Sequence, residues 1–283
     1  ASCHPDFDKF EGPEWIEGKL FTQLQSIPEA ASFVICVQRS GYDTILSSGN
    51  YSIFAPDNAA IEEYFTNHPL YNSVYDMSLK DLAALVKAHI IQNPWSRDQL
   101  QRANEEGWIN RWDPYNDEPW GYKRQTLLKD KDRKYWTYID PARDITRIVD
   151  STKSNNHRIV YQPSHKYIPF FFDDHMEIAG ISGKDYEFYF DRSFDPGYLY
   201  LANAQLSPKD YFAENGFIFI IDKVVPPLKN AEQLLEGSDN GNNFHMFLDL
   251  IYLFPTFHVN EYQTNEQPGV EEGHVVPTLY DLD

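Results

Sequence analysis

The sequence predicts an α+β domain built around antiparallel sheet. Helical patterns fill the first third of the chain, and strand patterns dominate from about residue 167 to residue 222. Strands and helices do not alternate regularly, which argues against a doubly wound nucleotide-binding fold. The 283 residues allow one large domain or two small ones.

The first helices are predicted from apolar spacing and end signals. Leu20, Phe21 and Leu24 share one face of a short helix, and a second helix opens at Pro28 and ends at Gly41. A short strand, Tyr51–Phe54, is followed by Pro56 and Asp57, and Asp57 can cap a helix from Asn58 to Phe65.

The clearest predicted helix begins at a capping box formed by Ser78 and Asp81. Apolar residues and His89 then recur at helical spacing until Asn93-Pro94 stops the run: Leu82, Leu85, Val86, His89 and Ile90. Because His89 follows Leu82 by seven residues on the same face, we expect its side chain to point into the core.

From residue 95 to about residue 165 the sequence predicts a loop-rich excursion with strands at Lys134–Ile139 and Arg158–Gln162. Four strands follow: Tyr167–Phe172, Tyr186–Asp191, Tyr198–Ala202 and Phe217–Asp222. Beyond Pro226-Pro227, helices are predicted at Ala231–Glu236 and Asn243–Phe254, the second with an apolar face of Phe244, Phe247, Leu248 and Ile251. The last 29 residues are polar and acidic, without periodicity.

The charge balance excludes whole classes of partner. Lys and Arg number 24 against 43 Asp and Glu, so the formal charge is −19. Nucleic acids and anionic membranes bind through Lys and Arg, so neither is an expected partner. No apolar run is long enough to cross a bilayer.

The two cysteines differ in their surroundings. Cys36 lies in an apolar helical stretch, where a free thiol behaves as a small hydrophobic residue. Cys3 follows Ala1-Ser2, and two small residues before a cysteine are typical of a processed bacterial lipoprotein. Cys3 is therefore a candidate lipid anchor, and an unmodified terminal cysteine is the alternative.

Three segments resemble the fasciclin domain family. Residues Tyr51–Ile61 are similar to its first signature, a strand reading T-V-F-A-P-T-D-x-A-F. Residues Leu85–Ile91 are similar to the central helix that ends in Tyr-His and two apolar residues. Residues Asn215–Pro227 are similar to the second signature, N-G-x-I-H-x-I-D-x-V-L-x-P. The three motifs occur in the family's order, and together they indicate its fold.

The resemblance implies a wedge-shaped antiparallel β-sandwich with several helices packed against it. It implies an N-terminal tether at 1–13, the fasciclin-like domain at 14–228 with a long aromatic-rich insertion at about 95–165, and at 229–283 either a tail or the start of a second repeat. The motif positions are expected to be structural: Phe54, Pro56, Asp57, His89, Asn215, Gly216 and Asp222.

Two departures from the family pattern bear on function. The family's Tyr before the helical His is Ala88 here, and the His of the second signature is Phe219. In animal relatives the Tyr-His region is linked to integrin binding, so integrin recognition is not expected of this chain.

Catalytic signatures are absent from the sequence. It has no nucleophile elbow, phosphate-binding loop, dinucleotide-binding glycine motif, H-E-x-x-H or C-x-x-C. The doublets Glu105-Glu106 and Asp173-Asp174 are interpreted as solvated surface, because sequence neighbours point in different directions. Asp173–His175 and Asp239–Asn242 lack the bidentate Glu of a calcium loop. We predict no catalytic residues, no metal site and no cofactor.

The aromatic insertion is the strongest candidate for a binding surface. Five rings fall within fifteen residues, among acidic and amide side chains: Trp108, Trp112, Tyr115, Trp120 and Tyr122. Ring faces pack on sugar C–H groups while polar side chains bind hydroxyls, so a glycan site is one interpretation. The other is that these rings close a small satellite core under a long loop.

The sequence therefore favours a non-catalytic surface lipoprotein that binds a glycan, matrix or an envelope protein. The resemblance places it on the outer-membrane surface of a Gram-negative bacterium, in contact with the membrane only through its lipid anchor. The alternative is a carbohydrate-binding component of a polysaccharide-uptake system that uses the aromatic insertion. A hydrolase acting on the same glycans is a third hypothesis, for which the sequence offers no acid/base pair.

Overall fold

The computed structural model describes residues 18–103, 122–129, 133–160, 165–236, 244–259, 261–265 and 280–282. The chain divides into two compact units. Unit 1 comprises Ala1–Leu128 and His165–Pro227, and unit 2 comprises Lys129–Ser164 and Leu228–Asp283. Part of the predicted insertion and the C-terminal segment thus fall in the same unit.

Unit 1 is built on a barrel of seven strands closed in the order β1-β10-β9-β8-β7-β3-β2. The strands are β1 (Tyr51–Pro56), β2 (Ile90–Gln92), β3 (Lys123–Lys129), β7 (His165–Phe171), β8 (Tyr200–Leu201), β9 (Ala204–Ala213) and β10 (Gly216–Ile221). Strand β1 pairs in parallel with β10 and antiparallel with β2. The barrel therefore places the first and second signature strands side by side, with Phe54 opposite Phe219.

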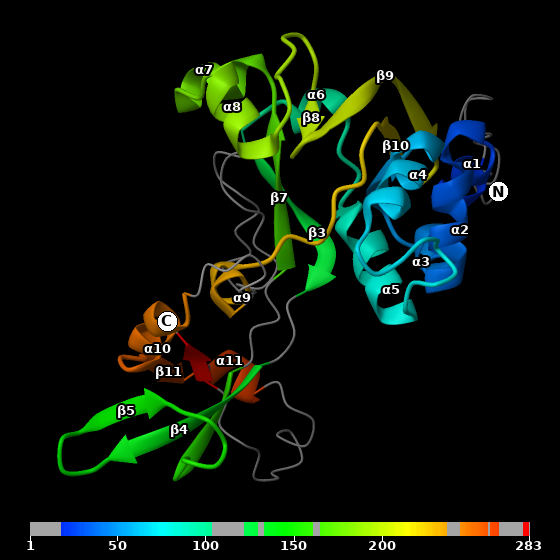
Figure 1. The fold of residues 1–283 in the computed structure, drawn as a ribbon. Helices are drawn as coiled ribbons and strands as arrows, with labels where there is room; N and C mark the ends of the chain where they lie inside the picture. The colour runs from blue at the N-terminus through cyan, green and yellow to red at the C-terminus, as the bar shows by residue number, and fades with distance from the viewer. Residues whose placement is uncertain are drawn as a thin grey trace, which may run out of the picture. The chain divides into compact units, whose positions relative to one another are not determined.

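Helices cover this barrel, which confirms the predicted α+β class (Figure 1). They are α1 (Leu20–Gln25), a 3₁₀ turn (Pro28–Ala30), α2 (Ala31–Ser40), α3 (Asp43–Ser48), α4 (Asn58–Asn67), α5 (Leu79–Ala88), α6 (Arg97–Leu100), α7 (Asp173–Ala179) and α8 (Gly183–Phe190). Helices α1 to α5 gather together and share one core with β1 and β10. Cys36 is buried in this core, and burial raises the pKa of its thiol to about 12.

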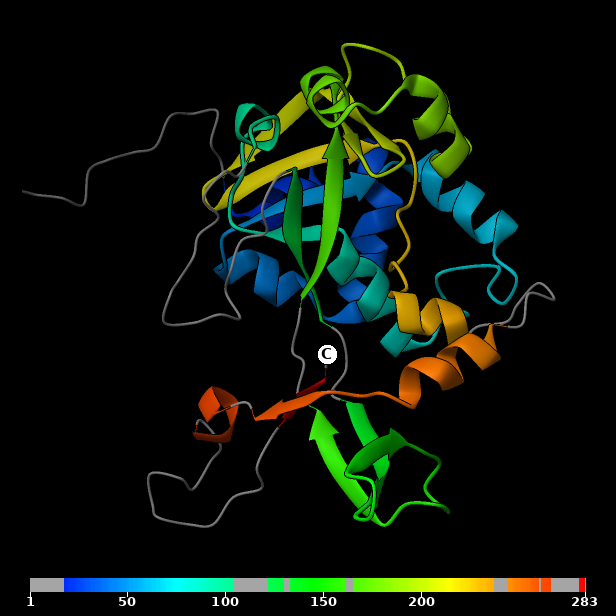
Figure 2. The same ribbon diagram turned by 90° about the vertical axis from the view of Figure 1, so that its left-hand side faces the viewer.

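A second core lies inside the barrel. Phe54 contacts Phe170 and Phe219, with ring centroids 5.4 and 5.0 Å apart. Figure 2 shows β3 and β7 side by side, and Phe170 on β7 belongs to this second core. The aromatic residue in the first signature therefore packs from β1 onto β10 and onto β7, and thereby ties distant parts of the sheet together.

The predicted strand Tyr186–Asp191 is wrong, because this segment forms helix α8. Ser182 accepts a hydrogen bond from the Asp185 backbone N–H and Asp185 returns one, which makes a complete capping box. Tyr186 and Phe190, four residues apart, then share the face that packs against the barrel. Helix capping and this shared face outweigh the strand preference of aromatic residues.

The helix predicted to run past His89 ends earlier, at Ala88. Ile90–Gln92 leaves the helix as β2 and pairs with β1. At the start of α5, the Ser78 hydroxyl oxygen accepts from the Asp81 N–H at 3.1 Å, as the sequence predicts. The predicted strand Tyr198–Ala202 is shorter than expected, since β8 contains only Tyr200 and Leu201.

Unit 2 contains a five-stranded sheet in the order β11-β12-β6-β4-β5. The strands are β4 (Arg133–Asp140), β5 (Ile145–Ile148), β6 (Asn156–Val160), β11 (Phe257–Val259) and β12 (Tyr280–Leu282), and the helices are α9 (Ala231–Glu236), α10 (His245–Tyr252) and α11 (Glu261–Asn265). The Glu232 carboxylate on α9 accepts hydrogen bonds from Tyr135 and Tyr252. Of the four apolar residues predicted to share a face on α10, only Leu248 is buried.

Candidate functional site

His89 lies in the central helix motif and hydrogen-bonds to residues of both signature segments. It is fully buried at the C-terminal end of α5. Its Nδ1–H donates to the Leu85 carbonyl oxygen at 2.8 Å, and Nε2 accepts from the Val225 N–H at 3.0 Å. Its own carbonyl oxygen accepts from the Phe54 N–H at 2.9 Å. Burial lowers the pKa of His89 to about 4, so the ring is neutral at pH 7.

The other signature residues also bond within the fold. Asp57 caps α4 by accepting from the Ala60 N–H at 2.7 Å, and its N–H donates to the Ile221 carbonyl oxygen. Asn215 accepts from the Leu20 N–H at 2.8 Å and donates to the carbonyl oxygens of Leu46 and Gly49. These bonds connect the two signature strands to the helical layer.

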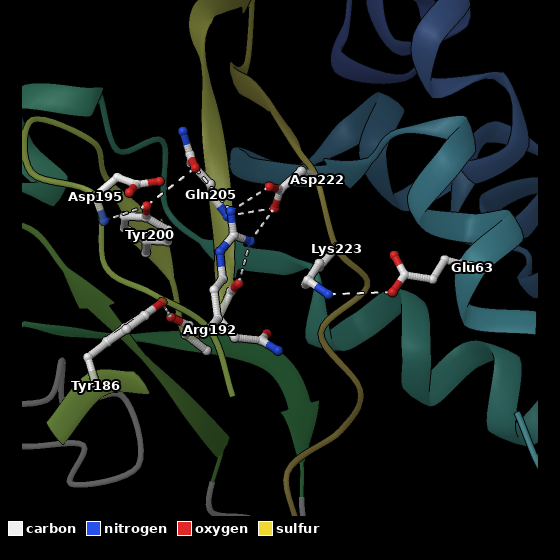
Figure 3. Close-up of polar contacts among 10 residues, drawn as sticks. Glu63, Tyr186, Arg192, Asp195, Tyr200, Gln205, Asp222 and Lys223 are labelled. Carbon is white, nitrogen blue, oxygen red and sulfur yellow. Dashed lines mark hydrogen bonds and ion pairs between the residues drawn. The ribbon is translucent and has the colours of Figure 1, made fainter. Parts of the chain in front are cut away.

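Asp222, at the end of the second signature strand, is the partner of Arg192 (Figure 3). The two side chains form an ion pair with a closest distance of 2.7 Å. Arg192 also donates to the Asn203 carbonyl oxygen at 2.9 Å and to the Gln205 side-chain oxygen at 3.0 Å. Asp222 accepts from the Gln205 N–H at 2.8 Å. Arg192 therefore fastens the segment after α8 to β9 and to the end of β10.

Replacing Arg192 with methionine should lower the free energy of unfolding by about 2 kcal/mol. The largely buried guanidinium donates hydrogen bonds to three residues, Asn203, Gln205 and Asp222, and methionine would leave all three without this donor. Urea unfolding of the full chain measures this. The control is Lys19→Met, which removes an ion pair with Glu214 whose side chains are 48% and 45% exposed, and which should have little effect. Equal effects for the two variants would contradict the prediction.

The turn between β8 and β9 is strained. Its first residue, Ala202, has φ of +51°. The other described non-glycine residues with positive φ are Asn93, Asp144 and Asp191, of residue types that tolerate this conformation. The Tyr186 hydroxyl donates to the Ala202 carbonyl oxygen at 2.7 Å, and Arg192 holds the carbonyl of Asn203. The network in Figure 3 therefore fixes this turn in an unfavourable conformation.

A hollow of about 290 Å³ lies beside this turn. It is bounded by α4 and the two residues after it, by the turn and by the segment after β10, all within unit 1. Its lining residues are Ala60, Glu63, Tyr64, Asn67, His68, Pro69, Asn203, Lys223, Val224 and Pro226. The hollow thus combines apolar surface, the rings of a tyrosine and a histidine, two amide side chains and one charge of each sign.

Tyr122 is the one predicted ligand-binding residue within the described ranges. Its half-buried ring lies 5.1 Å from the ring of Phe172 and 4.2 Å from that of His175, centroid to centroid. Phe172 also lines a smaller hollow of about 160 Å³, together with Gln101, Asp173, Asp174, Gly197 and Tyr198. Tyr122 therefore packs against the second core at the edge of a polar depression.

The remaining predicted ligand residues, Trp108, Trp112, Tyr115 and Trp120, and the candidate anchor Cys3 lie outside the described residues. Within the described ranges, no group of three or more His, Cys, Asp or Glu side chains is arranged to hold a metal ion. Asp173 and Asp174 stand in the first turn of α7, where Asp173 accepts from the Gly197 N–H at 2.8 Å. None of the described helices has the length and apolarity to span a membrane.

Sequence reasoning missed the residues that shape the larger hollow. His68 and Asn203 belong to no sequence motif, and Lys223 occupies an unspecified position of the second signature. The only available signal was local: Lys223 follows Asp222 directly in the second signature. Arg192 directly follows Tyr186–Asp191, which the sequence predicts as a strand and which forms α8, so its position beside Asp222 could not be predicted.

A match to one family model agrees with the first signature and with the central helix motif. Residues 28–131 match the fasciclin domain model, a range that includes the first signature and the His89 helix. The chain is similar to the structure of a FAS1 domain pair from the insect cell adhesion molecule fasciclin I, with 14% identity and a TM-score of 0.32. That match covers 81% of this chain and 58% of the other, so this chain spans less than two thirds of its length. The search of curated proteins finds no match.

Proposed function

Because residues 28–131 of this chain match the fasciclin domain, we propose that it is a non-catalytic binding module of the cell surface. Its partner is a glycan, a matrix component or another envelope protein. Fasciclin domains typically serve adhesion or binding. The excess of 19 negative charges favours neutral or basic partners over nucleic acid.

The observation that carries this proposal is that the polar side chains of the signature residues form hydrogen bonds inside the fold. Both ring nitrogens of His89, the side-chain amide of Asn215 and the carboxylate of Asp222 are bonded inside the fold. Because His89 is fully buried and both its ring nitrogens bond to the backbone, it is not placed to exchange a proton with a substrate. The polar groups of the signatures serve the fold, which supports a binding module rather than an enzyme.

A panel of immobilised polysaccharides and matrix proteins tests this function. We expect the purified full chain to bind at least one class saturably, with the bound ligand unchanged in mass after prolonged incubation. A ligand that becomes shorter with time would show turnover and overturn the non-catalytic proposal. Failure to bind any member of the panel at millimolar concentration would overturn the binding proposal.

Attachment to the bacterial outer-membrane surface through a lipid on Cys3 is part of the same proposal. It is supported by the small residues Ala1 and Ser2 before that cysteine. Bacterial cells that express the chain behind a lipoprotein signal sequence can be fed an alkyne-tagged fatty acid. We expect label and membrane fractionation to be lost in Cys3→Ser and kept in Cys36→Ala, which changes the buried thiol. Absence of label on the wild-type protein would exclude a lipid anchor at Cys3.

A carbohydrate-binding role in polysaccharide uptake is the second candidate. The smaller hollow favours it, because the partly exposed Tyr198 ring lies beside Asp174 and Gln101, a combination of ring face and hydrogen-bonding groups. A glycan array tests it with Trp112→Ala and Trp120→Ala in the aromatic insertion. Loss of glycan binding in these variants would support the insertion as the binding site. Unchanged glycan binding would exclude the insertion as the site.

A further inference from the structure

We propose that the 290 Å³ hollow beside the Ala202–Asn203 turn binds a single neutral sugar residue, and this inference rests on the proposed function as a binding module. The volume is at the lower end of the range for small-molecule sites, which suits a ligand of one ring. The hollow lies within one unit and is bounded by a helix, a strained turn and the segment that follows barrel strand β10.

The first argument is the set of unused hydrogen-bonding groups. The side-chain amides of Asn67 and Asn203 have no hydrogen-bond partner within the part of the chain that the structure describes. At His68, Nδ1 accepts from the N–H groups of Leu70 and Tyr71 at 3.1 and 3.2 Å, so the ring proton resides on Nε2. That N–H also lacks a partner among the described residues. The lining therefore presents donors and acceptors together, as a hydroxyl-bearing ligand requires.

The second argument is charge. Glu63 and Lys223 line the hollow with opposite charges and face each other, 3.5 Å apart (Figure 3). The pair contributes no net charge, and the chain as a whole repels anions. A neutral ligand with hydroxyl groups can bond to either partner without leaving the other unpaired. A charged ligand would have to displace one of them.

The third argument is the shape of the apolar part. Tyr64 contributes an aromatic ring to the lining, and Ala60, Pro69, Val224 and Pro226 contribute further apolar surface. An aromatic ring face can pack on the C–H groups of a sugar, while the amides bind its hydroxyls. The strained Ala202 backbone is held by Tyr186 and places Asn203 at the edge of the hollow. Strain that the surrounding structure maintains is typical of a functional position.

Isotope-labelled full chain, titrated with D-glucose, D-galactose, D-xylose and N-acetyl-D-glucosamine, tests this inference by amide chemical shifts. We expect at least one neutral sugar to shift residues around the hollow with a millimolar Kd. Asn67→Ala and Lys223→Met should each weaken that binding about tenfold or more. Thr66→Ala, an exposed α4 change outside the lining, should not. Asn67 is exposed, so its variant should keep the wild-type unfolding midpoint.

Several outcomes would overturn the inference. Tighter binding of D-glucuronate than of any neutral sugar would contradict the ligand class. Sugar binding that survives Asn67→Ala and Lys223→Met but is lost in Trp112→Ala would place the site in the insertion and leave the proposed function intact. The sugar site would also be rejected if no sugar shifted any amide at 50 times a Kd of about 1 mM. This holds even if the chain binds a matrix protein.

Discussion

Replacing Gly216 with alanine is expected to lower the free energy of unfolding by about 3 kcal/mol or more. Gly216 opens the second signature strand with φ of +156°, which residues with a side chain rarely adopt. A Cβ atom there would lie 1.8 Å from the Tyr51 carbonyl oxygen and 3.0 Å from a Leu20 methyl carbon. The backbone of Tyr51 cannot withdraw freely, because its N–H donates to Asn215 and β1 pairs with β10 throughout.

Urea unfolding of the purified chain measures this effect, and Gly183→Ala is the matched control. A Cβ atom at Gly183 meets no heavy atom within 4 Å, and the residue begins helix α8 with an ordinary φ. We expect Gly183→Ala to keep the wild-type midpoint or to raise it slightly, since alanine favours helix. Similar midpoints for the two variants would show that β1 and β10 do not approach as closely as the structure indicates.

The fold class could be predicted from the sequence because local signals agree with it. Asp57 and Ser78 precede helices as caps, and Asn215-Gly216 opens a strand. Each of these assignments depends on a few adjacent residues. The segment Tyr186–Asp191 shows the limit, because its rings favour a strand while the Ser182–Asp185 capping box favours a helix. The capping box was present in the sequence and was the better guide.

The larger hollow could not be predicted because its parts meet only in the folded barrel. Asn67 ends α4, Asn203 lies in the β8–β9 turn and Lys223 follows β10, so sequence separations exceed 100 residues between the helix and the others. Arg192, which holds the turn, has its partner Asp222 thirty residues away. No helical or strand period relates such positions. Exposed polar residues of this kind carry no pattern until the fold brings them together.

Lowering the pH from 6.5 to 4 should destabilise unit 1 by about 3 kcal/mol through His89 alone. Burial lowers the pKa of His89 from 6.5 to about 4. The unfolded chain therefore binds a proton in this window that the folded chain does not, so stability falls as pH falls. The contribution is fully present above pH 6.5 and is progressively lost toward pH 4. Urea unfolding at half-unit pH steps measures the slope.

His89→Gln separates this effect from the other titrating groups. The variant should lose about 2 kcal/mol at pH 7, because Val225 N–H and the Leu85 carbonyl lose well-placed partners. It should also flatten the slope between pH 4 and pH 6.5. His175→Gln is the comparison: burial also lowers the pKa of that half-buried ring, so this variant should keep the larger His89 part of the slope. An unchanged slope in His89→Gln would mean that the imidazole is not held neutral between Leu85 and Val225, and the contact between the three signature segments would then need another explanation.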